Sequence, residues 1–434
     1  MAEQKYTISD IIETYISGDW GNDEPTEDAS CPVSCIRGAD IVPIYNSEYN
    51  NIPLRYISEK SLSNRALQEG DIVIEKSGGS PTQSTGRVVY ISKELLEEKQ
   101  DIVCSNFCAA FRIKPEWDAK YVYYYLQHIY NAGVFFNFEG KTSGLKNLIM
   151  DTAFKSITIK KIAIETQRSI ATVLSTIESK MAANRAINHY LEAMAKQLYD
   201  YWFVQFDFPD ENGKPYKSSG GRMVWNEKLK REIPLGWDSM TIGDYAPCKG
   251  GYAFKSSSFC EEGIPVIKIG NIQEDYTLNM SDSQCIFDFT NVSYFAHRYD
   301  LVIAMTGATI GKFAVSQREY LINQRVGRFD LGNNPISKLG YLLNSLKQDY
   351  FREQIFQISG GCAQPNISSD QIDSIIILKP DNSLLNEFNE RCESLISQQS
   401  ELLLQTEHLI TLRNEILPLL MNGQIGVKQL NNDL

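Results

Sequence analysis

The chain has 434 residues, of which 43% are hydrophobic and 22% charged, and its formal net charge is −12. This length predicts two to four domains, each able to bury a core, and the composition is that of a soluble globular protein. No apolar run is long enough to cross a membrane, and the opening MAEQKYTISD is unlike a signal peptide, which predicts a cytoplasmic protein with no membrane partner. The acidic balance argues against nucleic-acid binding over the whole surface but allows local contacts.

From Tyr6 to about Ile159, short β-like runs are broken by Gly, Pro, Asn and Ser. The runs are VSCIRGADIV, GDIVIEK, GRVVYIS and FCAAFRI, and a helical segment, YVYYYLQHIY, interrupts them. The same order recurs from Met240 to about Leu378, in IPVIKIGNI, YDLVIAM, GKFAVS and VGRFDL, followed by a helix near residues 339–357. The pattern predicts two mixed α/β domains, each with a curled, largely antiparallel sheet of underived strand order.

Two pairs of segments indicate an internal duplication. GDIVIEKSGG at residues 70–79 is matched by YDLVIAMTGA at 299–308, and NLIMDTAFKSITI at 147–159 by NISSDQIDSIIIL at 366–378. A long helical pattern follows both members of the second pair, at residues 147–159 and 366–378. A repeat of half the chain is too long for a solenoid. It predicts a duplicated unit of one domain and one helix, which is typical of a protein that engages two similar targets.

Residues 165–204 contain no Gly or Pro, and apolar residues recur there at two positions of a heptad, which form the packing seams of a helix. The same register recurs in the last 50 or so residues. Polar residues on these seams, such as Asn184 and Gln399, would fix the register at a cost in stability. The shared register favours two antiparallel helices, each about 60 Å long, with the two domains at opposite ends and related by an approximate two-fold axis. The alternative is that each helix packs only on its own domain. The packing positions are Leu174, Ile177, Met181, Leu191, Leu198, Trp202, Leu395, Leu402, Leu409 and Ile416.

Polar loops follow the repeated strands: KSGGSPTQSTGR at residues 76–87 and TGATIGK at 306–312. Arg and Lys pair with guanine, Asn and Gln pair with adenine, and all of them reach phosphates, so these loops are candidates for DNA contact. The alternative is that they are ordinary solvated turns. The candidate DNA-binding residues are Lys76, Ser80, Thr82, Gln83, Ser84, Arg87, Lys141, Lys146, Thr306, Thr309, Lys312, Gln324, Arg325 and Arg328.

Catalytic and metal-binding patterns are missing from the sequence. The four histidines are isolated, the nine scattered cysteines lack zinc-site partners, and no nucleophile elbow, HExxH motif or phosphate-binding loop occurs. Asp71, Glu75 and Lys76 loosely suggest a nuclease cluster. In the second copy of the repeat, however, Ala304 takes the place of Glu75 and Met305 takes the place of Lys76, so the cluster is not repeated. These observations predict free thiols, no metal and no catalytic residue in this chain.

Three segments resemble the specificity subunits of Type I restriction–modification systems. LEAMAKQLYDYWFVQFDFPDENGKPYKSSGGRMVWNEKLKREIPLGW at residues 191–237 is similar to the family's central region. ETQRSIATVLSTIE at residues 165–178 resembles the start of its central helix, and LPLLMNGQI at 417–425 resembles its helix-ending motif.

The resemblance implies a non-catalytic subunit that reads double-stranded DNA with a bipartite target, one half-site per recognition domain. It also implies two modification methyltransferase subunits and restriction (motor) subunits as partners. S-adenosylmethionine is then expected in the methyltransferase partner, and no cofactor in this chain. Together with the duplication, it implies a first recognition domain at residues 1–160, a helix at 161–205, a connector at 206–237, a second recognition domain at 238–380 and a helix at 381–434.

Two other interpretations remain. One is a coiled-coil adaptor without direct DNA contact. The other is a self-contained DNA enzyme such as a fused methyltransferase, which would need an (Asp/Asn)-Pro-Pro-aromatic motif, and the chain has no Pro-Pro pair.

Overall fold

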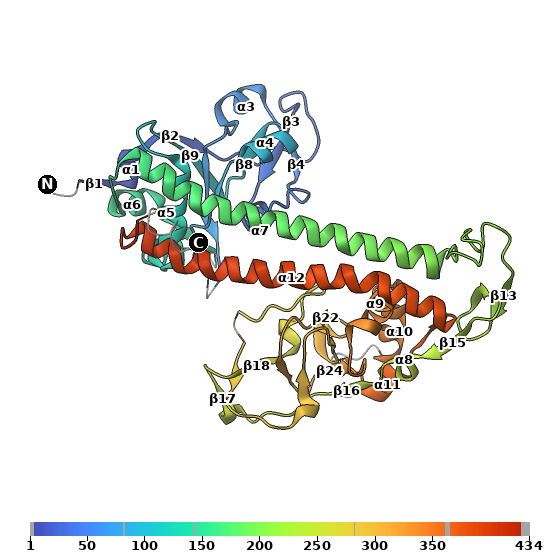
Figure 1. The fold of residues 1–434 in the computed structure, drawn as a ribbon. Helices are drawn as coiled ribbons and strands as arrows, with labels where there is room; N and C mark the ends of the chain where they lie inside the picture. The colour runs from blue at the N-terminus through green and yellow to red at the C-terminus, as the bar shows by residue number, and fades with distance from the viewer. Residues whose placement is uncertain (1–3, 81–82, 143–144, 282, 361–364, 427–434) are drawn as a thin grey trace. The chain divides into compact units, whose positions relative to one another are not determined.

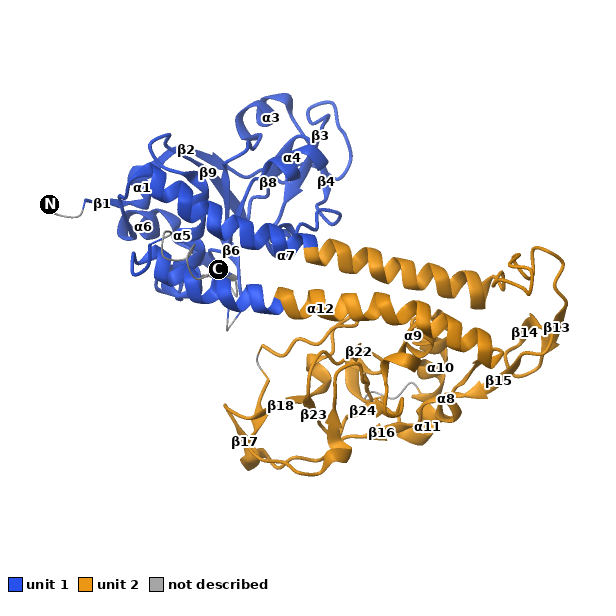
Figure 2. Ribbon diagram, in the orientation of Figure 1, with its two compact units in different colours: residues 1–183, 407–434 blue, residues 184–406 orange. Residues whose placement is uncertain are grey.

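A computed structural model describes residues 4–80, 83–142, 145–281, 283–360 and 365–426. The chain divides into two compact units (Figure 2): unit 1 comprises residues 1–183 and 407–434, and unit 2 comprises residues 184–406. The long helices α7 (Ile164–Tyr199) and α12 (Asn382–Met421) each contribute to both units (Figure 1). Among the described residues, none of the helices combines the length and apolar character that a membrane crossing requires.

Unit 1 is built on two sheets of short strands. The central sheet has the order β2-β9-β5-β7 and is antiparallel throughout. In the second sheet, β3 pairs antiparallel with β4 and parallel with β8. A small sheet, β10-β11-β6, and the pair β1-β12 complete the unit. The strands are β1 (Lys5–Thr7), β2 (Ile12–Ser17), β3 (Cys31–Ile36), β4 (Leu54–Ile57), β5 (Ile72–Glu75), β6 (Ser77–Gly78), β7 (Val88–Tyr90), β8 (Ile102–Cys104), β9 (Cys108–Ile113), β10 (Glu139–Thr142), β11 (Leu145–Leu148) and β12 (Thr158–Lys160). The short helices are α1 (Ile8–Ile11), α2 (Ile41–Tyr45), α3 (Glu59–Arg65), α4 (Lys93–Glu98), α5 (Ala119–Asn131) and α6 (Met150–Ser156).

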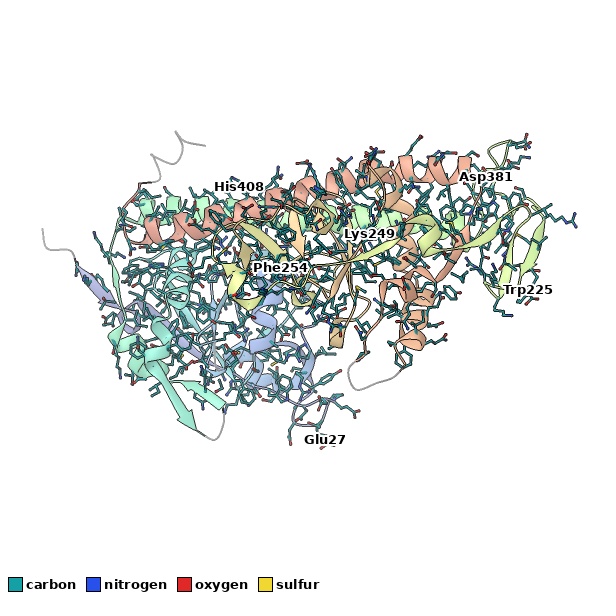
Figure 3. The ribbon with its side chains drawn as sticks, turned by 90° about the horizontal axis from the view of Figure 1, so that it is seen from below. Glu27, Trp225, Lys249, Phe254, Asp381 and His408 are labelled. Carbon is teal, nitrogen blue, oxygen red and sulfur yellow. The ribbon has the colours of Figure 1, made fainter. Side chains whose placement is uncertain are left out.

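Unit 2 repeats this plan. Its central sheet has the order β16-β24-β21-β22, and its second sheet has the order β17-β19-β18-β23-β20 with β18 and β23 parallel. The strands are β13 (Met223–Asn226), β14 (Arg231–Pro234), β15 (Asp238–Thr241), β16 (Cys248–Gly250), β17 (Phe259–Cys260), β18 (Ile264–Ile267), β19 (Cys285–Ile286), β20 (Phe295–Ala296), β21 (Leu301–Ala304), β22 (Phe313–Val315), β23 (Tyr320–Ile322), β24 (Val326–Phe329) and β25 (Ile376–Lys379). The helices are α8 (Ile242–Tyr245), α9 (Ile336–Leu346), α10 (Asp349–Ile358) and α11 (Ser369–Asp373). The hairpin β13-β14 carries Trp225, which is exposed (Figure 3).

Each unit closes on itself just before its long helix. In unit 1 the first strand, β1, pairs with the last, β12, and in unit 2 β15 pairs with β25. The short helix that follows β1 in unit 1 and β15 in unit 2 begins with a capping box, formed by Thr7 and Asp10 and again by Thr241 and Asp244. Such reciprocal bonds satisfy backbone donors that a helix start leaves free. The predicted duplication is therefore confirmed in strand order, strand direction and helix capping.

The two long helices run antiparallel within each unit. In unit 1, Leu174 and Met181 of α7 share a buried cluster with Ile416 of α12. In unit 2, the Asn184 side chain donates to Gln405 Oε1 at 3.1 Å and to Thr406 Oγ1 at 3.3 Å. The predicted pairing of the helices is confirmed, and the side-chain amide of Asn184 bonds across the helix pair.

The packing positions are not equally buried. Leu174, Ile177, Met181, Leu191, Trp202 and Ile416 are buried, whereas Leu198, Leu395, Leu402 and Leu409 are only partly buried. The start of α12 instead turns Phe388, Cys392 and Ile396 into the core of unit 2. Each helix therefore packs on its own domain as well as on its partner, and the alternative that it packs only on its own domain is wrong.

Two predicted elements differ from the structure. The run VSCIRGADIV ends as a strand at Ile36, because a 3-10 turn, Gly38–Asp40, and helix α2 follow. The single helix predicted near residues 339–357 is two helices, α9 and α10. The described cysteines are free thiols, as predicted; they are Cys31, Cys35, Cys104, Cys108, Cys248, Cys260, Cys285 and Cys392.

Candidate nucleic-acid interface

Three segments that are far apart in sequence meet at one edge of unit 1. The backbone N–H groups of Lys76 and Ser77 both donate to Phe107 O, at 2.8 and 3.0 Å. Leu148 N donates to Lys76 O at 2.7 Å, and Ser77 lies opposite Asn147 in the β6-β11 ladder. These bonds join the loop at residues 76–87, the turn at 105–108 and the hairpin β10-β11. We call this assembly the frame of unit 1.

Unit 2 contains the same frame. Met305 N donates to Arg325 O at 3.0 Å, and Ile367 N donates to Met305 O at 2.9 Å. Thr306 lies opposite Asn366 in an antiparallel bridge. The loop at residues 306–312, the turn at 323–326 and the segment at 365–367 are therefore held together as in unit 1. The backbone is repeated, whereas the exposed side chains are not.

Some predicted residues project from these frames. Gln83, Gln324 and Arg325 are exposed, and Lys76, Ser80, Thr306 and Thr309 are partly exposed. A turn places Gln83 beside Ser80, since the backbone N–H of Gln83 donates to the Ser80 hydroxyl at 3.1 Å. Arg325 Nη1 lies 3.4 Å from Asn366 Oδ1, which leaves most of its fork of donors directed outwards. These side chains have the surface access that a DNA contact requires.

Lys312 lies at the rim of a cavity in unit 2. The cavity has a volume of about 570 Å³ and is also lined by Tyr276, Phe351 and Arg352. Lys312 Nζ lies 2.7 Å from Glu274 Oε1, and this hydrogen bond lowers the pKa of the Glu274 carboxyl. Because Glu274 is exposed, the pair is a weak surface ion pair, and the DNA contact of Lys312 stays a prediction.

Arg87 and Arg328 do not project from the frames. Arg87 makes a bidentate ion pair with the buried carboxylate of Glu75, through Nη2–Oε1 at 2.7 Å and Nε–Oε2 at 2.9 Å. The hydrogen bond to Glu75 raises the pKa of Arg87. Arg328 donates to Phe295 O at 2.8 Å and lies 3.2 Å from Asp300. Both guanidinium groups neutralise buried carboxylates, so their predicted role in DNA contact conflicts with their structural role.

The remaining candidates are less accessible or only partly described. Ser84 is buried at 2% exposure, so its side chain lacks surface access, and its DNA contact stays a prediction. Lys146 is held over the Phe136 ring and 3.2 Å from Glu139. Thr82 lies outside the described residues. Lys141 pairs with Lys146 along the β10-β11 ladder, which places its backbone in the frame.

The carboxylates that suggested a nuclease cluster are internal ion-pair partners. Asp71 accepts two bonds from Arg112, at 2.8 and 2.9 Å, while Glu75 is held by Arg87. Within the part of the chain that the structure describes, no group of three or more His, Cys, Asp or Glu side chains is placed to hold a metal ion. His189, His297 and His408 are exposed, and His408 projects from α12 (Figure 3).

Most of the chain matches a known protein family. A family model described as the Type I restriction modification DNA specificity domain matches residues 4–193 and 234–383, which is most of the chain. The chain belongs to this specificity family.

Individual relatives agree with the family match. The chain is 22% identical over 409 residues to the Type I restriction enzyme MjaIX specificity subunit of Methanocaldococcus jannaschii, covering 91% of this chain and 88% of that one. It is 25% identical over 314 residues to the MjaVIII specificity subunit of the same organism, covering 69% and 71%. A crystal structure of the S subunit of a Type I restriction–modification system from M. genitalium has the same fold, with a TM-score of 0.58, 16% identity and coverage of 96% and 95%.

The turn at residues 105–108, which is part of the frame of unit 1, was absent from the sequence prediction. The turn at residues 105–108 reads SNFC, and its structural counterpart at 323–326 reads NQRV. The two are identical at none of the four matched positions, so they do not align by identity. The signal that could have found the first turn is its position, because each turn directly precedes the strand that pairs with the repeated strand, β9 in unit 1 and β24 in unit 2.

Proposed function

We propose that this chain is the DNA-reading subunit of a Type I restriction–modification complex, and that each unit reads one half-site of a bipartite target. The observation that carries this proposal is the repeated frame with different exposed side chains. A rigid backbone that presents variable side chains is what sequence readout requires, since base contacts must be held within fractions of an ångström. Two such frames in one chain correspond to two half-sites.

The partners in this proposal are modification methyltransferase subunits, two per chain, and restriction subunits. An apolar stripe on α7 in unit 2 supports a helical partner: Ile187, Tyr190 and Met194 are 44%, 68% and 54% exposed and recur with heptad spacing. Such a stripe is what a partner helix covers in a coiled coil. The partner also supplies positive charge that this acidic chain lacks.

In this proposal the chain carries no chemistry of its own. The pairing of Asp71 with Arg112 and of Glu75 with Arg87 supports this, because both carboxylates are committed to internal ion pairs. Methyl transfer to adenine requires the base to be flipped out of the duplex into an active site. We assign that site, with its S-adenosylmethionine, to the modification subunit.

A domain exchange tests the proposal. Residues 233–379 are replaced by the matching part of a relative with a different target, and the complex with modification subunits is assayed by sequencing methylated DNA. We expect one half-site to change and the other to stay. Loss or change of both half-sites, in a chimera that circular dichroism shows to be folded, would refute independent reading. A gel shift with and without modification subunits separates this function from that of an adaptor that never contacts DNA.

A further inference from the structure

The turn at residues 105–108 presents two exposed side chains on a fixed backbone. Cys108 N donates to Ser105 O at 2.9 Å, and Ser105 N donates to Ile36 O at 2.8 Å. Gly18 lies so close that a Cβ there would be 2.0 Å from Ser105 O. Ser105 and Cys108 are buried, whereas Asn106 is exposed and Phe107 is 57% exposed.

The turn at residues 323–326 of unit 2 is held by the same bonds. Val326 N donates to Asn323 O at 2.8 Å, and Asn323 N donates to Ile267 O at 3.0 Å. Gly251 takes the place of Gly18, since a Cβ there would be 2.2 Å from Asn323 O. The two exposed residues at the tip are Gln324 and Arg325.

The backbone network therefore assigns equivalent places to the two tips. The carbonyl of Phe107 accepts from Lys76 N, and the carbonyl of Arg325 accepts from Met305 N, where Lys76 and Met305 are themselves equivalent in the repeat. Asn106 accordingly occupies the place of Gln324, and Phe107 occupies the place of Arg325. Both tips combine an amide with a large side chain.

We propose that Asn106 and Phe107 are specificity-determining residues of unit 1, as the sequence predicts Gln324 and Arg325 to be of unit 2. This inference rests on the function proposed above. An exposed phenylalanine alone is common on protein surfaces. Here the backbone of the phenylalanine is fixed by two neighbouring segments of the same chain. One of these segments carries Lys76, which can reach a phosphate.

The chemistry of the two tips differs and so assigns different bases. Asn and Gln make bidentate bonds to the N6 and N7 edge of adenine, and Phe contacts the methyl group of thymine. Arg makes a bidentate contact to O6 and N7 of guanine. The tip of unit 1 therefore reads A·T pairs, and the tip of unit 2 reads a guanine beside an adenine.

The test uses the full chain assembled with its modification subunits. Methylation of a panel of single-base variants of the target is measured for Asn106→Ala, Phe107→Ala and the exchange variant N106Q/F107R. We expect the alanine variants to lose discrimination by about 5- to 150-fold at one or two adjacent A·T pairs of one half-site. The exchange variant should favour guanine at the position that Phe107 reads. Arg325→Ala should relax the discrimination for guanine at one position of the other half-site.

Leu54→Ala is the matched control, because Leu54 is 58% exposed on β4 of the same unit and lies outside the frame. It should match wild type across the panel. Unchanged discrimination in both alanine variants, or a uniform loss over all sequences with weaker subunit assembly, would overturn the inference while the bipartite target of the wild type stands. A wild-type complex without a bipartite target would instead refute the proposed function. Melting temperatures equal to the control's show that the variants are folded.

Discussion

Buried carboxylates at the start of the repeated strands illustrate how the duplication works at the level of residues. Asp71 and Asp300 each accept the backbone N–H of the residue three positions earlier, at 2.8 Å in both cases. The arginine that pairs with the carboxylate comes from a different position in each unit. Arg112 follows Phe111, which lies opposite Ile72 in the ladder, whereas Arg328 itself lies opposite Val302. The carboxylate is repeated, and the charge that neutralises it comes from a different place on the neighbouring strand.

Arg87→Ala should destabilise unit 1 rather than change base specificity. Removal of the guanidinium leaves the Glu75 carboxylate buried without its partner, and breaking a buried pair in this way costs about 3 kcal/mol. We expect that loss in the free energy of unfolding measured with urea. Arg325→Ala is the control, since its exposed side chain should contribute less than about 0.5 kcal/mol. Wild-type stability of Arg87→Ala, together with relaxed readout of one base, would return Arg87 to the interface.

Tyr199 should make unit 2 sensitive to alkaline pH. Burial raises the pKa of Tyr199 from 10.0 to about 12, and the hydrogen bond with Ser345 opposes this shift. Between these values the unfolded chain loses a proton that the folded protein keeps, so the free energy of unfolding falls as the pH rises. Tyr199→Phe should therefore lose less stability between pH 10 and pH 12 than the wild type does. Urea titrations across that range test this, with the exposed Tyr190→Phe as the control. Equal losses in wild type and Tyr199→Phe would contradict it.

At the scale of elements, periodicity predicted helices and strands well. The strands β5, β7, β9, β21, β22 and β24 and the helices α5, α7 and α12 lie where the patterns placed them. Strand order was not predictable, because alternation describes one strand and not its partner. The parallel pair β3-β8 joins Ser34 with Ile102, which lie 68 residues apart along the chain. The break between α9 and α10 also lacks a signal, since Lys347 and Gln348 are ordinary helix residues.

The candidate site was only partly predictable for a related reason. Arg87 and Arg325 both sit beside polar loops in the sequence, and composition does not distinguish them. The difference is Glu75, which lies across the strand pair from Arg87 and is buried. Unit 2 has Ala304 at the place of Glu75, and Lys312, which takes the place of Arg87, pairs instead with the exposed Glu274. Exposure of a loop residue thus depends on partners that only the folded chain brings close.

At the scale of the whole molecule, the helices α7 and α12 are shared between the units, and we predict that their length sets the spacing of the half-sites. Deleting residues 180–186 together with 404–410 removes one heptad from each helix and eliminates Asn184 with both of its partners. Seven helical residues span about 10 Å, or roughly three base pairs of duplex. We expect the protein to fold and the preferred spacer to shorten.

This deletion is checked by methylation of targets whose spacers differ by single base pairs. A deletion in α7 alone is the control, because it leaves the helices out of register and should impair folding. Retention of the wild-type spacer preference by the folded double deletion would show that the helices do not set the distance.

The closing strand pairs, β1-β12 and β15-β25, have a consequence for inheritance. Because each pair brings the first and last strands of a recognition domain side by side, a gene segment that begins and ends within these strands encodes one whole domain, a cassette. Recombination between two such genes at these points exchanges one cassette while the reading frame and the ladder at its base are kept. New combinations of half-sites can then arise in a single genetic event, without the many successive substitutions that the reshaping of a recognition surface would need.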